Sequence, residues 1–152
     1  MPLPKLNPKL RPLWRCPRCR KTFVTRNLWH SCRRYDLKSL FARSEPRVFR
    51  LYRRFAAMVR ACGPVTINVQ QSRIAFQVRV RALGCVPLKS QLRIGFAFSQ
   101  RRSHPRFISV KTYGPTFHVH WISIRSEAEL DAEVHEWTRA AYARSAQREP
   151  ED

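Results

Sequence analysis

Three cysteines and one histidine near the start of the chain have the residue types and the spacing of a zinc site. Cys16 and Cys19 bracket a Cys-Pro-Arg-Cys turn, and His30 and Cys32 follow it. Zinc takes four ligands in a tetrahedron, and two residues between a pair of cysteines let the backbone fold around one ion. In an extended segment, His30 and Cys32 project to the same side. These four residues therefore predict a structural zinc ion with no coordination position left for a substrate.

A redox pair is the alternative interpretation of the Cys-Pro-Arg-Cys turn. A thioredoxin-like motif lies between a strand and a helix, and no such unit is indicated before residue 44. The two other cysteines, Cys62 and Cys85, stand in apolar patterns and are expected to be buried thiols. This cysteine usage favours metal binding in a reducing compartment, so we expect a cytoplasmic protein. Trp14, Phe23 and Trp29 are expected to cover the metal.

The chain is strongly basic, since its 152 residues include 30 Lys and Arg against 10 Asp and Glu, a formal net charge of +20. Residues 1–54 hold 16 of the basic and 2 of the acidic residues, so the excess centres on the zinc segment and the helix after it. Such a charge favours a polyanionic partner, and we expect sequence-tolerant contact with the phosphates of DNA or RNA. The alternative to such contact is a compositional bias towards arginine, in which the side chains are merely solvated at the surface. The candidate contacts are Arg15, Arg18, Arg20, Lys21, Arg33, Arg34, Arg79, Arg81, Arg101 and Arg102.

Catalytic motifs are scarce in the sequence. A metal-dependent nuclease needs clustered carboxylates, and neither Asp nor Glu occurs between Gly63 and Arg125. Gly-rich phosphate loops and the common hydrolase motifs do not occur in the sequence. We therefore expect a non-catalytic protein. One alternative is a metal-independent ribonuclease, in which His118 and His120, on one face of a strand near Lys111, perform acid–base chemistry.

A binding cleft for a small molecule or a protein is a further alternative. Phe76, Phe96, Phe98 and Trp121 occupy apolar positions of expected strands. A curved sheet with its helices could leave a cleft between these side chains. By default, the same residues form an ordinary core.

The order of the elements predicts an α+β domain. Apolar residues recur at helical spacing over 45–62, where Ser44 is the expected N-cap and Gly63 ends the helix. Apolar and polar residues then alternate over several short segments, which indicates an antiparallel sheet of about five strands. The segments are 65–69, 74–80, 92–98, 108–110 and 117–121. A capping box over residues 126–129 opens a second helix, so two helices are expected to bracket the sheet.

These elements divide the chain into four segments. Residues 1–13 carry four prolines and are expected to form a flexible basic arm, followed by a zinc-binding module at 14–36. The α+β domain is expected at 44–146 and an acidic tail at 147–152. No apolar run approaches the ~18 residues of a membrane helix, so neither membrane contact nor a secretory signal is expected. The sequence does not indicate an oligomeric state.

Several of these motifs together resemble a known family. They are W-x-C-P-x-C-x-x-x-F from Trp14, N-x-x-H-S-C from Asn27, a helix ending in Gly63-Pro64, a strand with Ile74-Ala75-Phe76, and D-x-E-V-x-x-W-x-x-x-A-Y from Asp131. Over about residues 14–145, the chain resembles a bacterial family known only as domain of unknown function number 5655. The resemblance implies a sheet between helices, a zinc module whose four ligands act together, and a loop at 82–86 where an aromatic residue is expected and this chain has none. It implies no function.

Overall fold

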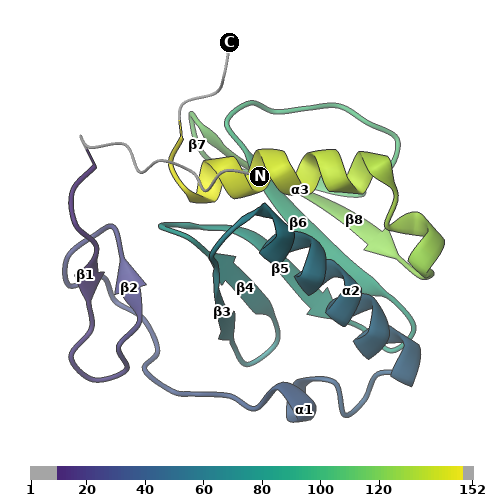
Figure 1. Cartoon of the computed structure of the whole chain (residues 1–152), viewed down its shortest axis with the longest axis horizontal. Helices are drawn as coiled ribbons and strands as arrows, with labels where there is room; N and C mark the ends of the chain where they lie inside the picture. The colour runs from purple at the N-terminus through teal and green to yellow at the C-terminus, as the bar shows by residue number, and fades with distance from the viewer. Residues whose placement is uncertain (1–9, 149–152) are drawn as a thin grey trace.

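The computed structural model in Figure 1 describes residues 10–148. Residues 1–9 of the expected basic arm and 149–152 of the expected acidic tail lie outside the described residues. A two-stranded sheet and a six-stranded sheet with helices confirm the α+β class, and no described helix is long and apolar enough to span a membrane. The elements are β1 (Trp14–Arg15), β2 (Thr22–Phe23), α1 (Leu37–Leu40), α2 (Pro46–Cys62), β3 (Thr66–Val69), β4 (Ile74–Gln77), β5 (Arg81–Pro87), β6 (Leu92–Phe98), β7 (Ser109–Gly114), β8 (Phe117–Ile124), η1 (Glu127–Glu129) and α3 (Ala132–Ser145).

The main sheet has six strands, where the sequence indicated about five. Its order is β3-β4-β5-β6-β8-β7, and each neighbouring pair is antiparallel. The additional strand is β5, over residues for which the family resemblance implied a loop. The strand expected at 74–80 ends at Gln77, where the pairing with β5 shifts in register. Strand β5 is not recognisable in the sequence, because the small residues Ala82 and Gly84 interrupt the alternation of apolar and polar side chains.

Helix α2 confirms the helix expected at 45–62. The predicted N-cap is wrong by one residue, since Glu45 takes that position and Pro46 begins the helix. Gly63 ends the helix with a φ of 146°, a conformation that favours glycine. One stripe of the helix is buried, as its apolar spacing predicts. The buried residues are Val48, Leu51, Tyr52, Phe55, Ala56 and Val59.

Helices α2 and α3 cover the same face of the main sheet, as Figure 1 shows. The Phe96 ring on β6 contacts both helices, because its centroid lies 6.2 Å from that of Phe55 in α2 and 6.0 Å from that of Trp137 in α3. The expectation of a sheet between two helices is therefore wrong. The second face of the sheet is not covered by either of these helices.

The side chains considered for a cleft do not line one together. Phe76, Phe96 and Phe98 are buried in the core beneath the two helices. Trp121 is only partly buried and alternates along β8 with the fully buried Ile122, so its side chain points to the opposite face. The cleft interpretation of these aromatic residues is therefore wrong.

The capping box over residues 126–129 forms a separate turn before the second helix. Residues Glu127–Glu129 make the 3-10 helix η1, so the predicted helix is present but starts later. Asp131 is the N-cap of α3, where its carboxylate accepts a hydrogen bond of 3.1 Å from the Val134 N–H. Arg106 binds the same carboxylate at 3.1 Å, which ties the β6–β7 connection to the start of α3.

The small sheet of β1 and β2 contacts the main sheet through polar and aromatic side chains. The Gln77 amide donates a hydrogen bond of 2.7 Å to the Thr22 carbonyl. The Arg81 guanidinium lies over the Phe23 ring, 5.2 Å from its centroid. These contacts place the N-terminal module beside β4 and β5.

Candidate metal centre

A tight turn between β1 and β2 presents Cys16 and Cys19. The Cys16 N–H donates to the Lys21 carbonyl, and the Arg20 N–H donates to the Cys16 carbonyl, both at 2.9 Å. Arg20 has a φ of 65°, which closes the turn just after Cys19. The two sulfur atoms thereby face the segment that follows β2.

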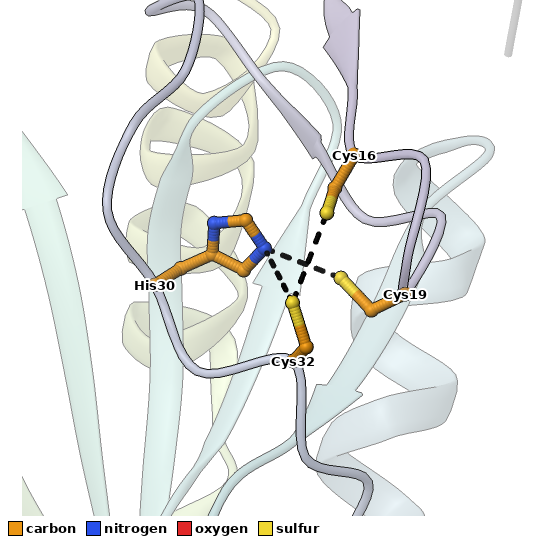
Figure 2. Close-up of side chains that lie close together, drawn as sticks. All are labelled: Cys16, Cys19, His30 and Cys32. Atoms are coloured by element: carbon orange, nitrogen blue, oxygen red, sulfur yellow. Dashed lines mark hydrogen bonds between the residues drawn. The ribbon is translucent and has the colours of Figure 1, made fainter.

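The four predicted ligands converge, as Figure 2 shows, with one donor atom of each within 4.8 Å of the others. The sulfurs of Cys16 and Cys32 are 3.8 Å apart. His30 Nε2 lies 3.3 Å from the Cys19 sulfur and 3.5 Å from the Cys32 sulfur. Tetrahedral bonds of ~2.3 Å to sulfur and ~2.0 Å to nitrogen would separate two sulfurs by about 3.8 Å and a sulfur from a nitrogen by about 3.5 Å. The four residues could therefore hold one metal ion.

A backbone carbonyl orients the histidine ligand. His30 Nδ1 lies 2.7 Å from the Leu28 carbonyl oxygen, so this nitrogen carries the proton and donates it to that oxygen. Nε2 is then the unprotonated nitrogen and can bind an ion. Arg34 adds a contact to the other half of the site by donating to the Cys19 carbonyl at 2.8 Å. Such partners fix ligand orientation before metal binding.

Two of the three expected aromatic residues cover the cluster. Phe23 is buried, and its ring centroid lies 4.4 Å from that of His30. The Trp14 ring lies 6.1 Å from the same imidazole. Trp29 is 90% exposed, so the expectation that it covers the metal is wrong.

The surroundings of two cysteines favour thiolates, the form that binds metal ions. The backbone N–H of Cys19 outweighs burial and lowers the pKa of Cys16 to about 6. Burial opposes ionisation of Cys19, but the Lys21 N–H and the His30 ring outweigh it and lower the pKa. Burial raises the pKa of Cys32, and its neighbours Cys16 and Cys19 raise it further. Because the protein supplies four ligands, the arrangement suits a structural ion better than a catalytic one.

The predicted basic contacts in the module are exposed, with one exception. Lys21 is half-buried and donates a hydrogen bond of 3.1 Å to the Ser31 carbonyl. No ion pair within residues 10–148 joins any of these side chains to a carboxylate. The exposed residues are Arg15, Arg18, Arg20, Arg33 and Arg34.

The predicted arginines outside the module have different surroundings. Arg79 is buried, and its Nε donates to Gln147 Oε1 at 2.7 Å, so this guanidinium is committed to a contact within the fold. Arg81 is half-buried, and its Nε is a buried donor without a partner among the described residues. Arg101 and Arg102 are exposed in the β6–β7 connection and not at the module.

The geometry around His120 supports a structural role. Its Nε2 accepts a hydrogen bond of 2.9 Å from the Arg102 N–H, and its Nδ1 lies 2.9 Å from the His118 carbonyl oxygen. Burial lowers the pKa of His120 and favours the neutral ring. Lys111 pairs with Val119, so it lies on the opposite face of the sheet from both histidines. These three residues do not form an acid–base cluster.

A cavity on the second face of the sheet was missed by sequence reasoning. Its volume is about 310 Å³, and β4, β5, β6 and β8 contribute to its lining. Gly84 and Gly95, paired across β5 and β6, lie in its floor. The available indication of this cavity in the sequence was that small residues occupy positions of successive strands that do not face the core. These small residues can be assigned to one cavity only once the register of β5 is known, and the sequence did not reveal that register.

Comparison with known proteins identifies the main domain. The family model described as Domain of unknown function (DUF5655) matches residues 37–145. The chain belongs to this family. The DUF5655 region runs from α1 to α3 and includes the whole main sheet. No curated protein and no solved structure matches the chain.

The metal cluster lies outside the DUF5655 region. Cys32, the last of the four candidate ligands, precedes Leu37, where the match begins. The family resemblance is therefore confirmed for the main domain. The module of β1 and β2 precedes the matched region.

Proposed function

We propose that this chain is a non-catalytic, zinc-stabilised protein that binds single-stranded DNA or RNA through its N-terminal module. One observation carries the proposal: the module presents exposed arginines and pairs none of them with a carboxylate within residues 10–148. Residues 14–36 contain seven Lys and Arg and one acidic residue, Asp36. Guanidinium groups suit phosphate because their planar donors match its oxygen atoms.

Zinc fits the ligand set better than other common ions. Three thiolates and one imidazole suit zinc, whereas calcium and magnesium prefer oxygen ligands. The sulfur–sulfur separation of 3.8 Å agrees with tetrahedral zinc coordination. The ion would hold the segment after β2 against the β1–β2 turn, and so keep Arg20 and Arg34 beside one surface cavity. Cysteines of this kind stay reduced in the cytoplasm, where we place the protein.

Trp29 supports a preference for single strands. Its exposed ring lines a surface cavity together with Arg33 and Tyr35. Proteins that bind single-stranded nucleic acid combine basic grooves with aromatic side chains on which unpaired bases stack. The bases of a duplex are already stacked and paired, so they cannot use such a ring in the same way.

The expected recognition is sequence-tolerant. Sequence readout in the major groove of DNA requires an inserted α-helix or a β-ribbon. Within residues 10–36 the only described elements are the two-residue strands β1 and β2. Affinity should therefore depend on phosphate charge and base stacking, and it should fall as the salt concentration rises.

A charge-matched pair of variants tests this proposal. Arg18→Ala/Arg33→Ala removes two exposed arginines of the module, and Arg50→Ala/Arg53→Ala removes two exposed arginines of α2. We expect the module variant to bind a single-stranded oligonucleotide about tenfold more weakly in a fluorescence anisotropy titration, because charged hydrogen bonds to phosphate are lost. The α2 variant should lose less than about threefold. Equal losses would show that net charge, and not the module, drives binding.

Metal analysis of the purified chain tests the zinc assignment. We expect about one zinc ion per molecule. Cys16→Ser/Cys19→Ser should carry no stoichiometric zinc, because it removes two thiolates from the ligand set. A module that stays ordered in the metal-free wild-type chain, or a chain that binds the oligonucleotide equally well after chelation, would contradict a zinc-stabilised module.

A further inference from the structure

The face of the main sheet opposite α2 and α3 contains a cavity of about 310 Å³. Ligand pockets in proteins measure roughly 300–1,000 Å³, so a small planar group would fill this one. Its lining comes from central strands and from the β3–β4 and β7–β8 hairpins. The cavity therefore opens to solvent on the side of the sheet that the two helices leave uncovered.

Small residues in cross-strand register form the floor of this open-face cavity. Ala75 pairs with Gly84, and Gly84 pairs with Gly95. Gly95 in turn pairs with Trp121. The Trp121 indole lies against the Gly95 backbone, since a Cβ at that glycine would come within 3.0 Å of two ring carbons. Because glycine has no side chain, the surface of the sheet is recessed at these positions, and the flat Trp121 ring borders the recess.

The rim of the cavity is aromatic on one side and basic on the other. Tyr113, which is 67% exposed, and Phe117 join Trp121 on the side of β7 and β8. Arg73 and Arg81 lie on the side of β4 and β5. The Arg81 Nε is a buried donor without a partner in residues 10–148, so an oxygen atom of a ligand would satisfy it. Because no carboxylate of the described residues lines the cavity, an anionic ligand meets no repulsion from them there.

Arg81 connects the cavity to the N-terminal module. Its guanidinium lies over the Phe23 ring of β2, 5.2 Å from the centroid. Arg81 and Gln70 also line the neighbouring cavity that contains Trp29. A strand bound at Trp29 can therefore extend onto the open face of the sheet and remain beside basic side chains.

We propose that the open-face cavity binds the base of an unpaired nucleotide against Trp121, with the phosphate of that nucleotide at Arg73 and Arg81. The inference rests on the proposed function, because this nucleotide belongs to the same single strand that the module holds. Base–aromatic stacking accepts any base, which agrees with sequence-tolerant binding. A base inside a duplex is paired and stacked, and so cannot enter. A free nucleotide offers the same base and phosphate, and the test separates the two sources.

The test compares three probes on the zinc-loaded full chain. They are oligothymidylate of about 12 nucleotides, an abasic oligonucleotide of equal length and charge, and thymidine monophosphate. Wild type should bind the thymidylate about tenfold more tightly than the abasic strand. Trp121→Leu and Tyr113→Ala should each reduce this preference by about threefold or more, and Tyr113 is exposed enough for its variant to fold. Arg93→Ala, on the same face but outside the cavity, should keep the preference.

The possible results distinguish base binding in the cavity from phosphate binding by the module. Equal binding of both oligonucleotides, or a base preference that survives in both cavity variants, would overturn the cavity proposal and leave phosphate binding by the module in place. Binding of thymidine monophosphate alone, lost in the cavity variants, would support the cavity and contradict the proposed function. No binding of any probe would overturn both.

Discussion

Two histidines of this chain use the imidazole ring in different ways. His30 donates from Nδ1 to the Leu28 carbonyl and presents Nε2 to the cysteine cluster. His120 is fully buried, and its Nε2 accepts from the Arg102 N–H. In both cases, the hydrogen bond at one nitrogen determines what the other nitrogen can do. His30 is thereby suited to a metal, whereas His120 fastens the β6–β7 connection to β8.

Replacing His120 with Phe should lower stability at neutral pH. The variant leaves the Arg102 N–H without its acceptor, which should reduce the free energy of unfolding by about 1–3 kcal/mol. Burial holds the pKa of His120 below its usual 6.5, although the His118 and Phe96 carbonyls favour the protonated ring. The unfolded chain therefore takes up the proton first as the pH falls, so the wild type loses stability from His120 below about pH 6.5.

Chemical denaturation from about pH 8 down to about pH 5 measures both effects. The difference in unfolding free energy between wild type and His120→Phe should shrink as the pH falls, because only the wild type carries this buried imidazole. His118→Phe is the matched control, since it changes a half-buried histidine on the same strand and leaves the Arg102 N–H bonded to His120. A difference between wild type and His120→Phe that stays constant with pH would contradict the neutral, buried role of this ring.

At the scale of elements, one buried amide joins the module of β1 and β2 to the DUF5655 domain. The Gln77 side chain at the end of β4 donates to the Thr22 carbonyl at 2.7 Å and to the Arg79 carbonyl at 2.9 Å. Its oxygen accepts from the Asn68 amide at 3.1 Å. Strand β2, strand β3 and the β4–β5 turn therefore share one hydrogen-bonding partner.

Gln77→Ala should loosen the module while the main sheet stays folded. Each carbonyl left without a donor costs about 1–3 kcal/mol, and the module has few other contacts to offset that loss. Hydrogen exchange should accelerate at the amides of the β1–β2 turn and remain slow in β6. Gln91→Ala removes a half-buried glutamine that binds Ser123 and should leave the module unchanged. Unchanged exchange in the β1–β2 turn of Gln77→Ala would show that other contacts hold the module.

The cluster of candidate metal ligands and α2 could be predicted from the sequence because local spacing determines them. Cys16 to Cys32 lie within one short segment, and the helical period of α2 lies within another. Strand β5 could not be predicted, since Gly84 and its small neighbours lack a regular period. The face of the sheet that α3 covers could not be predicted from the sequence either. Periodicity shows that a helix has a buried side, but tertiary packing decides which face of the sheet it meets.

Over the whole molecule, the net charge of +20 is compensated unevenly. Ion pairs surround the start of α3, where Arg106 meets Asp131 and Glu133, and Arg54 meets Glu127. The module has no such pair within residues 10–148. Positive charge therefore remains uncompensated at the module, which lies beside the open face of the sheet, and an extended polyanion could follow both surfaces.

The salt dependence of oligonucleotide affinity tests the central claim most directly. The logarithm of the association constant should fall linearly with the logarithm of salt concentration, by about 0.7 for each phosphate contacted in a single strand. Since six arginines of the module are exposed, we predict a slope between about −2 and −4 for the zinc-loaded chain. Cys16→Ser/Cys19→Ser should show weaker binding and a shallower slope. A slope near zero, or equal slopes and affinities for the two proteins, would contradict nucleic-acid binding by a zinc-stabilised module.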